Sequence, residues 1–340
     1  MRRALALVVA LAALLSTAVV AGAGEGDSNY GGPLRPLTLA VVGDSPYGTP
    51  QVGMFPSLVA DINADPRVKR VLHLGDIKNG SSVCSDEYFA TIRGYFDAFE
   101  DPLVYTPGDN EWTDCHRSNN GGYLPTERLD ALRGTFYPEP GYTLGQRSVR
   151  VQTQANELGF GPFVENQLFV QLRVVFSAVH VVGSNNDLEP WFGALETADQ
   201  RTRRLAEYAD RLEADLDWLD HTFRTAYRRG AYGVVIAMQA DMWDAASVAS
   251  GRPLDGFDPI VQRLADLSRN FGRPVLVLEG DSHQYTVDNP LAAGDPLHGV
   301  ELPVPNLTRI IVQGQTASEW LRLRVDPRSD RLFSWERVQL

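Results

Sequence analysis

One short stretch decides how this chain folds: Arg70-Val71-Leu72-His73-Leu74-Gly75-Asp76-Ile77-Lys78-Asn79-Gly80. An apolar run that stops at Gly-Asp and passes into a polar loop is typical of a buried strand that carries a carboxylate at its end. The same pattern occurs three more times, with the runs ending at Asp44, Asp109 and Asp281. One such aspartate would more often cap a helix or close a turn, so the repetition is the informative feature.

A further apolar run, residues 234–238, continues into Gln239 and Asp241. In open α/β sheets the carboxyl ends of the strands line the ligand crevice, so we expect the acids that follow all these runs to meet in one place. Carboxylates that meet repel one another unless cations lie among them. The sequence therefore predicts a metal site at the strand ends.

Helical and strand patterns alternate in the first part of the chain. Apolar residues recur at helical spacing over 55–62 and 88–99, between the runs that end at the first three acids. This alternation predicts parallel strands joined by right-handed crossovers. Residues 119–165 predict a long connection with a short helix near 126–133.

The second half begins with strand patterns over 168–176 and 178–182, and then has the clearest helical pattern, over 197–227, with apolar residues on one face. The end of the chain, residues 307–312, 320–325 and 332–338, predicts antiparallel strands.

The start of the chain has the pattern of a secretory signal peptide. Arg2 and Arg3 precede an apolar run, and Ala21-Gly22-Ala23 has the format of a cleavage site. We expect residues 1–23 to be the signal peptide, 24–36 a flexible leader, and 37–340 one domain. The predicted location is exported, either periplasmic or extracellular; an uncleaved membrane anchor is the alternative.

The formal net charge is −12. An acidic chain of this kind argues against nucleic acid or an anionic membrane as the main partner.

The chain has two cysteines, Cys84 and Cys115. An isolated pair in an exported protein is more often a disulfide than a metal site. Each follows one of the acid-bearing runs, so a bridge would join the loops after Asp76 and Asp109. We predict this disulfide; two free buried thiols are the alternative.

The ordered set Gly43-Asp44, Gly75-Asp76, Gly108-Asp109-Asn110-Glu111 and Gly280-Asp281-Ser282-His283 resembles the motifs of the calcineurin-like metallophosphoesterases, including the purple acid phosphatase branch. The resemblance implies an α/β fold, a four-layer α/β/β/α sandwich with two mixed β-sheets flanked by helices. It also implies hydrolysis of phosphate monoesters or diesters, either small molecules or polymers, by a metal-bound hydroxide at a site of one or two metals.

The resemblance also assigns ligands by position. Asp44 and His283 would bind the first metal, and Asp76 would bridge both metals. Asp109 stands where the family has a metal-binding Asn, and Asp281 where it has a His on the second metal. These ligands are almost all oxygen donors, which favours Mg²⁺, Mn²⁺ or Ca²⁺ over Zn²⁺ or Fe.

The sequence also lacks two other histidines of the family pattern. Gln239, or Asp241 if the alignment shifts by two residues, replaces the His of the fourth motif. Asn110 replaces the acid–base His of the third motif, and an amide cannot donate a proton to a leaving group. His116 and Lys78 are the nearest candidates to supply that proton. The predicted catalytic residues are Asp76, Asn110 and His116.

Two other functions remain open. The chain could be a non-catalytic metal-binding module on a degenerate phosphoesterase fold, as Asn110 suggests. Gly43-Asp44-Ser45 also resembles the nucleophile block of the SGNH ester hydrolases, with Ser45 as nucleophile. Those enzymes need a late Asp-x-x-His, and Asp281-Ser282-His283 is one residue too short. Ser45→Ala would abolish the activity of a serine hydrolase and leave that of a metal enzyme.

Overall fold

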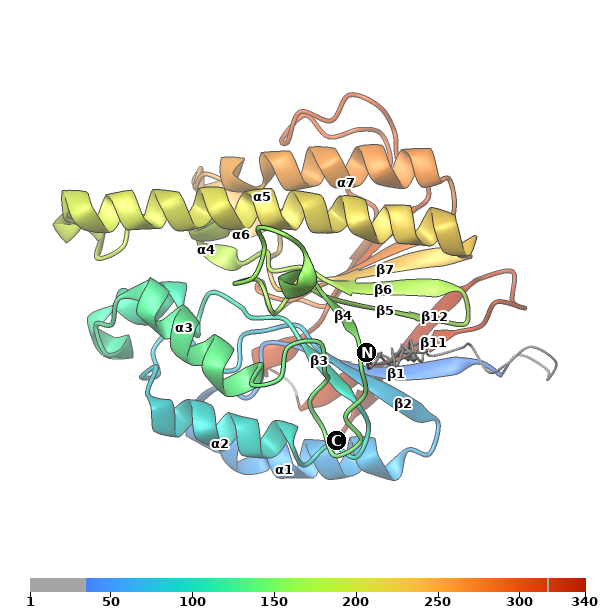
Figure 1. The fold of residues 1–340 in the computed structure, drawn as a ribbon, viewed down its shortest axis with the longest axis horizontal. Coiled ribbons are helices and arrows are strands. Elements are labelled where there is room, and N and C mark those ends of the chain that lie inside the picture. The colour runs from blue at the N-terminus through green and yellow to red at the C-terminus, as the bar shows by residue number, and fades with distance from the viewer. Residues whose placement is uncertain (1–34, 317) are drawn as a thin grey trace, which may run out of the picture. The chain divides into compact units, whose positions relative to one another are not determined.

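Two mixed β-sheets stand at the centre of the fold (Figure 1). The structure, a computed structural model of the chain, describes residues 35–316 and 318–340. The predicted signal peptide and most of the predicted leader lie outside the described residues. Among the described residues, no helix is long and apolar enough to cross a membrane.

The first sheet contains the strands that precede the first three acids. Its central strands β1, β2 and β3 run parallel, and α1 and α2 connect them as the alternating pattern predicts. The C-terminal hairpin β11–β12 pairs antiparallel with β1 on the other side. In sheet order the strands are β12 (Phe333–Gln339), β11 (Glu319–Val325), β1 (Leu37–Val42), β2 (Val68–His73) and β3 (Leu103–Tyr105).

The second sheet is larger, and its middle strands β6, β7, β8 and β10 run parallel. The prediction that residues 307–312 pair antiparallel with the C-terminal strands is wrong, because β10 lies beside β8 in this other sheet. An apolar run shows that a strand is buried but not which strand it pairs with. In sheet order the strands are β4 (Gln152–Thr153), β5 (Gln167–Gln171), β6 (Val174–Ala178), β7 (Gly233–Ala237), β8 (Val275–Glu279), β10 (Leu307–Ile311) and β9 (Thr286–Asp288).

Helices cover the outer faces of both sheets. Figure 1 shows α1 and α2 along the first sheet and α5 and α7 along the second. This arrangement confirms the predicted α/β class with two mixed sheets flanked by helices. The helices are α1 (Gly48–Ala64), α2 (Asp86–Phe96), α3 (Pro125–Phe136), α4 (Gly183–Asp187), α5 (Ala198–Arg229), α6 (Ala245–Ser250) and α7 (Asp258–Phe271).

Alternating side chains of the strands build the layers. In β1, Leu39 and Val41 belong to the hydrophobic cluster between the sheets, whereas Ala40 and Val42 belong to the cluster under α1 and α2. Successive side chains of a strand point to opposite faces, so each strand joins two cores. Strand β7 of the second sheet is apolar throughout because both of its faces are buried.

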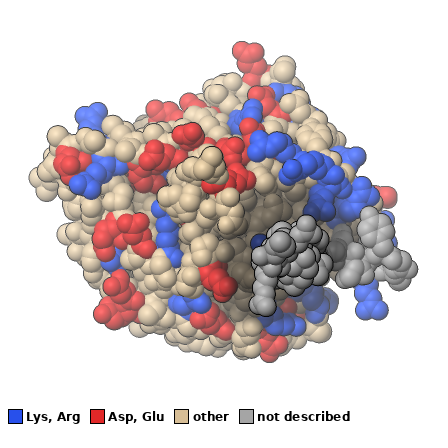
Figure 2. All heavy atoms as spheres, viewed as in Figure 1, with Lys and Arg blue, Asp and Glu red and all other residues tan. Residues whose placement is uncertain are grey.

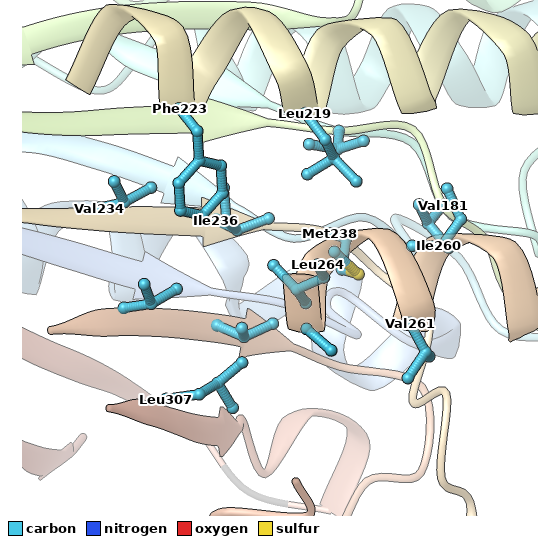
Figure 3. Close-up of a cluster of buried hydrophobic side chains, with 14 of the residues drawn as sticks. Val181, Leu219, Phe223, Val234, Ile236, Met238, Ile260, Val261, Leu264 and Leu307 are labelled. Atoms are coloured by element: carbon cyan, nitrogen blue, oxygen red, sulfur yellow. The ribbon is translucent and has the colours of Figure 1, made fainter. Parts of the chain in front are cut away.

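The third core lies between the second sheet and its helices. Figure 3 shows Leu219 and Phe223 of α5 directed toward Val234 and Ile236 of β7, with Leu264 of α7 beside them. Burying a side chain of this size contributes about 2 kcal/mol to stability.

The long helix α5 agrees with its sequence pattern. Thr197 and Gln200 form a capping box at its start, and Gly230, with a φ of 56°, ends it in the left-handed conformation.

Charged side chains are unevenly distributed over the face shown in Figure 2. The largest group of Lys and Arg side chains lies toward the upper right of this view, and others are scattered among Asp and Glu over the rest of the face. The excess of acids in the composition is therefore not confined to one place on this face.

Candidate metal centre

The predicted acids follow strands of both sheets. Asp44, Asp76 and Asp109 lie in the loops after β1, β2 and β3 of the first sheet, and Asp281 follows β8 of the second. The two sheets face each other, so their strand ends deliver these side chains to one place. The structure thus brings the four aspartates together, as predicted from the strand ends.

The glycines of the Gly-Asp pairs have a steric role. A Cβ atom on Gly280 would lie 2.6 Å from Oδ2 of Asp44, and a Cβ atom on Gly108 would collide with the carboxylate of Asp76. Each glycine therefore leaves room for an aspartate that follows another strand. This explains in physical terms the glycine of two of the four Gly-Asp pairs.

The ligand atoms form two overlapping groups. Asp44, Asp76 and His283 make one group, and Asp76, Asp109 and Asp281 make the other; within each, the candidate atoms all lie within 4.8 Å of one another. Asp76 belongs to both groups, which is the geometry expected of a bridging ligand. Its role as a ligand, like that of the other four residues, stays a prediction.

The backbone at these residues is unusual. Asp44, Asp76, Asp281 and His283 have φ values of 50°, 54°, 71° and 55°, in the left-handed region that L-residues rarely adopt. Such strain persists only where the surrounding structure enforces it, and it concentrates at functional sites.

The electrostatics of the cluster favour a bound cation. Burial, with the nearby charges of other carboxylates, raises the pKa of Asp44 to about 8 and those of Asp76 and Asp281 well above the usual range. Oδ1 of Asp44 accepts a hydrogen bond from the Asp281 amide at 2.9 Å, whereas buried Oδ2 has no hydrogen-bond partner among the described residues. A buried oxygen without a partner costs free energy, and a cation would satisfy it. The residues present therefore fit a metal ion.

Two side chains orient Asp76. Oδ2 accepts hydrogen bonds from the Tyr47 hydroxyl and from Nδ2 of Asn110, each at 2.6 Å. Burial, followed by the charge of Asp76, raises the pKa of Tyr47 well above its usual value, so the phenol keeps its proton and donates it. Asn110 thus lies at the predicted site, and its amide positions Asp76. Tyr47 was not predicted, because the sequence does not show that its hydroxyl points to Asp76.

Glu111 holds the loops under the cluster. Its Oε1 accepts hydrogen bonds from the amides of Asp76 (3.1 Å) and Gly108 (2.7 Å) and from the Tyr105 hydroxyl (2.7 Å). Glu111 is fully buried, so these bonds fix the loop after β2 against the loop after β3. The sequence showed Glu111 only as part of a motif and did not reveal this positioning role.

The fourth-motif candidates, Gln239 and Asp241, lie beside the acid cluster and have hydrogen-bond partners of their own. Oε1 of Gln239 accepts from the Gly183 amide at 2.7 Å, and its Nε2 faces Oδ1 of Asp109 at 3.3 Å. Asp241 pairs with Arg309 of β10, with Nη1 at 2.7 Å from Oδ1. Each candidate already has a strong partner among the described residues.

The proposed proton donors lie apart from the cavity. Nδ1 of His116 contacts the Thr113 carbonyl at 2.7 Å, and its ring packs edge-on against Phe192. Lys78 is buried and donates to the Asn110 carbonyl at 2.7 Å; burial lowers its pKa to about 8. Neither side chain is among the described residues that line the cavity.

The structure contains the predicted disulfide between Cys84 and Cys115, with 5.8 Å between the Cα atoms. Cys84 precedes α2 and Cys115 lies in the short helical turn Thr113–His116. The bond therefore ties together the loops that follow β2 and β3, next to the acid cluster.

A cavity of about 570 Å³ opens above the cluster. This volume is within the usual size range of a ligand site. The residues that line the cavity include Asp76, Asp109, Asp281 and His283. The lining also includes residues that the sequence did not predict as site residues. Among them are Asp114, Arg117, Ser184, Glu189 and Arg252.

Ser45 is not arranged as a catalytic serine. His73 contacts its carbonyl oxygen through Nε2 at 2.8 Å. Among the described residues, the Ser45 hydroxyl has no hydrogen bond to an imidazole, which a serine nucleophile would need.

Comparisons with known proteins gave structural matches only. No protein-family model and no curated protein matches the chain. It is structurally similar to the purple acid phosphatase PPD1 from yellow lupin (Lupinus luteus) seeds, at 9% identity and a TM-score of 0.45, over 90% of this chain and 52% of that one. It is also similar to GAP50, the anchor in the inner membrane complex of Plasmodium, at 9% identity and a TM-score of 0.40, over 90% of this chain and 89% of that one. The chain thus spans about half the length of the phosphatase.

Proposed function

We propose that this protein is an exported, metal-dependent hydrolase of phosphate esters. One observation carries the proposal: four aspartates and His283, from loops far apart in the chain, meet with a buried carboxylate oxygen of Asp44 left without a partner. A cation bound by the cluster would satisfy that oxygen. The order of the Gly-Asp motifs, which resembles that of the metallophosphoesterases, supports the same function.

The donor set indicates the kind of metal. Asp44, Asp76 and His283 would hold one cation, and Asp76, Asp109 and Asp281 would hold a second. Carboxylate oxygens predominate, so we expect Mg²⁺, Mn²⁺ or Ca²⁺ rather than Zn²⁺ or Fe. Bound divalent cations supply Lewis acidity toward phosphoryl oxygens and lower the pKa of a coordinated water.

The protein's own residues prepare the site. Tyr47 and Asn110 fix the orientation of Asp76, and Glu111 fixes the loop that carries it. Hydrolysis breaks the P–O ester bond, adds the oxygen of water to phosphorus and delivers a proton to the leaving alcohol. Asn110 cannot supply that proton, and the hydroxyl proton of Tyr47 is directed to Asp76.

A second function is favoured by Asn110. Both hydrogen bonds that its Nδ2 donates, to Tyr47 at 2.8 Å and to Asp76 at 2.6 Å, hold the cluster. A chain that binds a cation without hydrolysing esters would need no proton donor at this position. A non-catalytic metal-binding module is therefore the alternative.

Export is supported by the disulfide, since such bonds persist in oxidising compartments. The expected partner is a small or polymeric phosphate ester.

The test is an activity panel on the purified full chain. p-Nitrophenyl phosphate and bis(p-nitrophenyl) phosphate are assayed with Mg²⁺, Mn²⁺, Ca²⁺ or Zn²⁺, beside Asp76→Asn. The matched control is Asp210→Asn, which changes an exposed carboxylate on α5. We expect turnover that requires one of the hard cations and is lost only in Asp76→Asn. Metal binding without turnover would favour the binding module, and turnover that survives a chelator would refute the proposal.

A further inference from the structure

Two arginines line the cavity above the acid cluster, and we propose that they determine which class of phosphate ester binds there. The phosphate esters bound here carry a second anionic group, which Arg117 and Arg252 bind. This inference rests on the proposed function, because it concerns the same site.

The two arginines stand out in the lining. Among the described residues that line the cavity, Arg117 and Arg252 are the ones that carry a guanidinium group. The other charged residues of the lining are carboxylates, apart from His283. Three of these acids, Asp114, Glu189 and Asp244, lie outside the predicted metal ligands, and Asp241 is only the alternative fourth-motif ligand. An anionic ester that enters is repelled by these walls, except where cations compensate.

Both guanidinium groups lie on the wall formed around Ser184. Nη1 of Arg117 is 2.5 Å from Oδ2 of Asp114, and Nη2 of Arg252 is 3.3 Å from Oε1 of Glu189. Ser184 connects the two acids: its hydroxyl faces Asp114 at 3.4 Å, and its carbonyl accepts from the Glu189 amide at 3.3 Å. The two ion pairs therefore share one wall of the cavity, which adjoins the aspartate cluster because the Ser184 hydroxyl also donates to Oδ2 of Asp109 at 2.7 Å.

These ion pairs leave the arginines available. The side chains of Arg117 and Arg252 are 40% and 59% exposed. Asp114 is buried and Glu189 is partly exposed, so each arginine is held at one side and leaves N–H groups of its planar, five-donor guanidinium toward solvent. A ligand phosphate or carboxylate can bind that fork in a bidentate manner while the protein's own carboxylates keep the arginines in place.

The size of the cavity fits a ligand with two anionic ends. The cavity's volume of about 570 Å³ exceeds what one phosphate group occupies. If the phosphate to be cleaved binds at the aspartate cluster, the rest of the molecule extends toward the arginine wall. Pro253 and Leu254 follow Arg252 in the lining and would contact a short carbon body between the two charges.

Binding of non-hydrolysable phosphonates tests this inference without requiring turnover. The affinities of 4-phosphonobutyrate and butylphosphonate for the full chain with Mn²⁺ are measured by titration calorimetry. The pair differs by one terminal carboxylate. The variants are Arg117→Gln/Arg252→Gln and, as a matched control, Arg203→Gln, which breaks an exposed pair with Asp199 on α5.

We expect 4-phosphonobutyrate to bind the wild-type chain about tenfold more tightly than butylphosphonate, as one bidentate charge-assisted contact would give. The double variant loses this preference, and Arg203→Gln keeps it. Equal affinities in the wild type, or a preference that persists in the double variant, overturn this inference alone. A wild-type chain that does not bind Mn²⁺ overturns the proposed function and this inference with it.

Discussion

Replacing Asp44 by asparagine should change how the stability of the metal-free protein depends on pH. Asp44 is fully buried, and its pKa of about 8 is raised mainly by burial and further by Asp109, Glu111 and Asp241. The unfolded chain releases this proton near the ordinary value of 3.8. Because the folded state holds the proton more tightly, the contribution of Asp44 to stability is greatest at acid pH and is lost as the pH rises through 8.

The magnitude follows from the two pKa values. One pKa unit corresponds to about 1.4 kcal/mol, so ionisation of Asp44 lowers the free energy of unfolding by roughly 4 kcal/mol between pH 5 and pH 8.5. Asparagine keeps an oxygen that can accept from the Asp281 amide but cannot ionise. Metal-free Asp44→Asn should therefore lose less stability over this range than the wild-type chain.

A bound cation should offset the loss of stability that the wild-type chain shows at high pH. Mn²⁺ at a hundred times its dissociation constant would stabilise the wild-type chain by about 2.7 kcal/mol, and Asp44→Asn by much less. Urea unfolding of both proteins between pH 5 and 8.5, with EDTA or with Mn²⁺, measures both responses. Asp210→Asn, on the exposed face of α5, is the control and should behave like the wild type. Identical pH slopes and identical metal responses in Asp44→Asn and the wild type would refute the reasoning.

Three further predictions concern the supports of the site. Gly280→Ala places a Cβ atom 2.6 Å from Oδ2 of Asp44 and should weaken Mn²⁺ affinity about tenfold in a calorimetric titration. The control Gly94→Ala adds a Cβ atom with nothing within 4 Å and should leave the affinity unchanged. Equal affinities in the two variants would contradict the steric argument. Glu111→Ala leaves three buried donors without an acceptor and should lower the free energy of unfolding, measured in urea, by about 3–5 kcal/mol. Glu111→Gln keeps one acceptor oxygen and should lower it less. A loss below about 1 kcal/mol in Glu111→Ala would speak against the positioning role of Glu111. Reduction of the disulfide, which links residues 31 apart, should lower the free energy of unfolding by about 3–4 kcal/mol in the same assay. A chain that is equally stable in reducing agent would exclude this contribution.

Local patterns predicted the centre of the fold. Asp44, Asp76, Asp109 and Asp281 each follow an apolar run, and parallel strands place such residues at one edge, so their meeting could be expected. Apolar residues that recur at helical spacing predicted the flanking helices. The sheet that contains β10 could not be predicted, because its apolar pattern is the same in either sheet.

The sequence did not predict which side chains from distant segments would contact the candidate site residues. Asp241 stays a candidate ligand, but its ion pair with Arg309 of β10 has no signal in the sequence. His116 is next to the disulfide, but its ring contacts Phe192 from another loop. Tyr47 required knowledge of where its hydroxyl points. Each of these facts depends on tertiary contacts that sequence spacing does not encode.

The central claim is that aspartates from separate strands hold divalent cations. Metal content and affinity of the full chain, measured by mass spectrometry after dialysis against Mn²⁺ and by titration calorimetry, test it most directly. We predict saturable binding of one or two ions per chain, weakened on the order of 100-fold or more in Asp76→Asn, which removes the side chain common to both ligand groups. A wild-type chain that retains no Mn²⁺, or an Asp76→Asn variant that binds it equally well, would contradict the account.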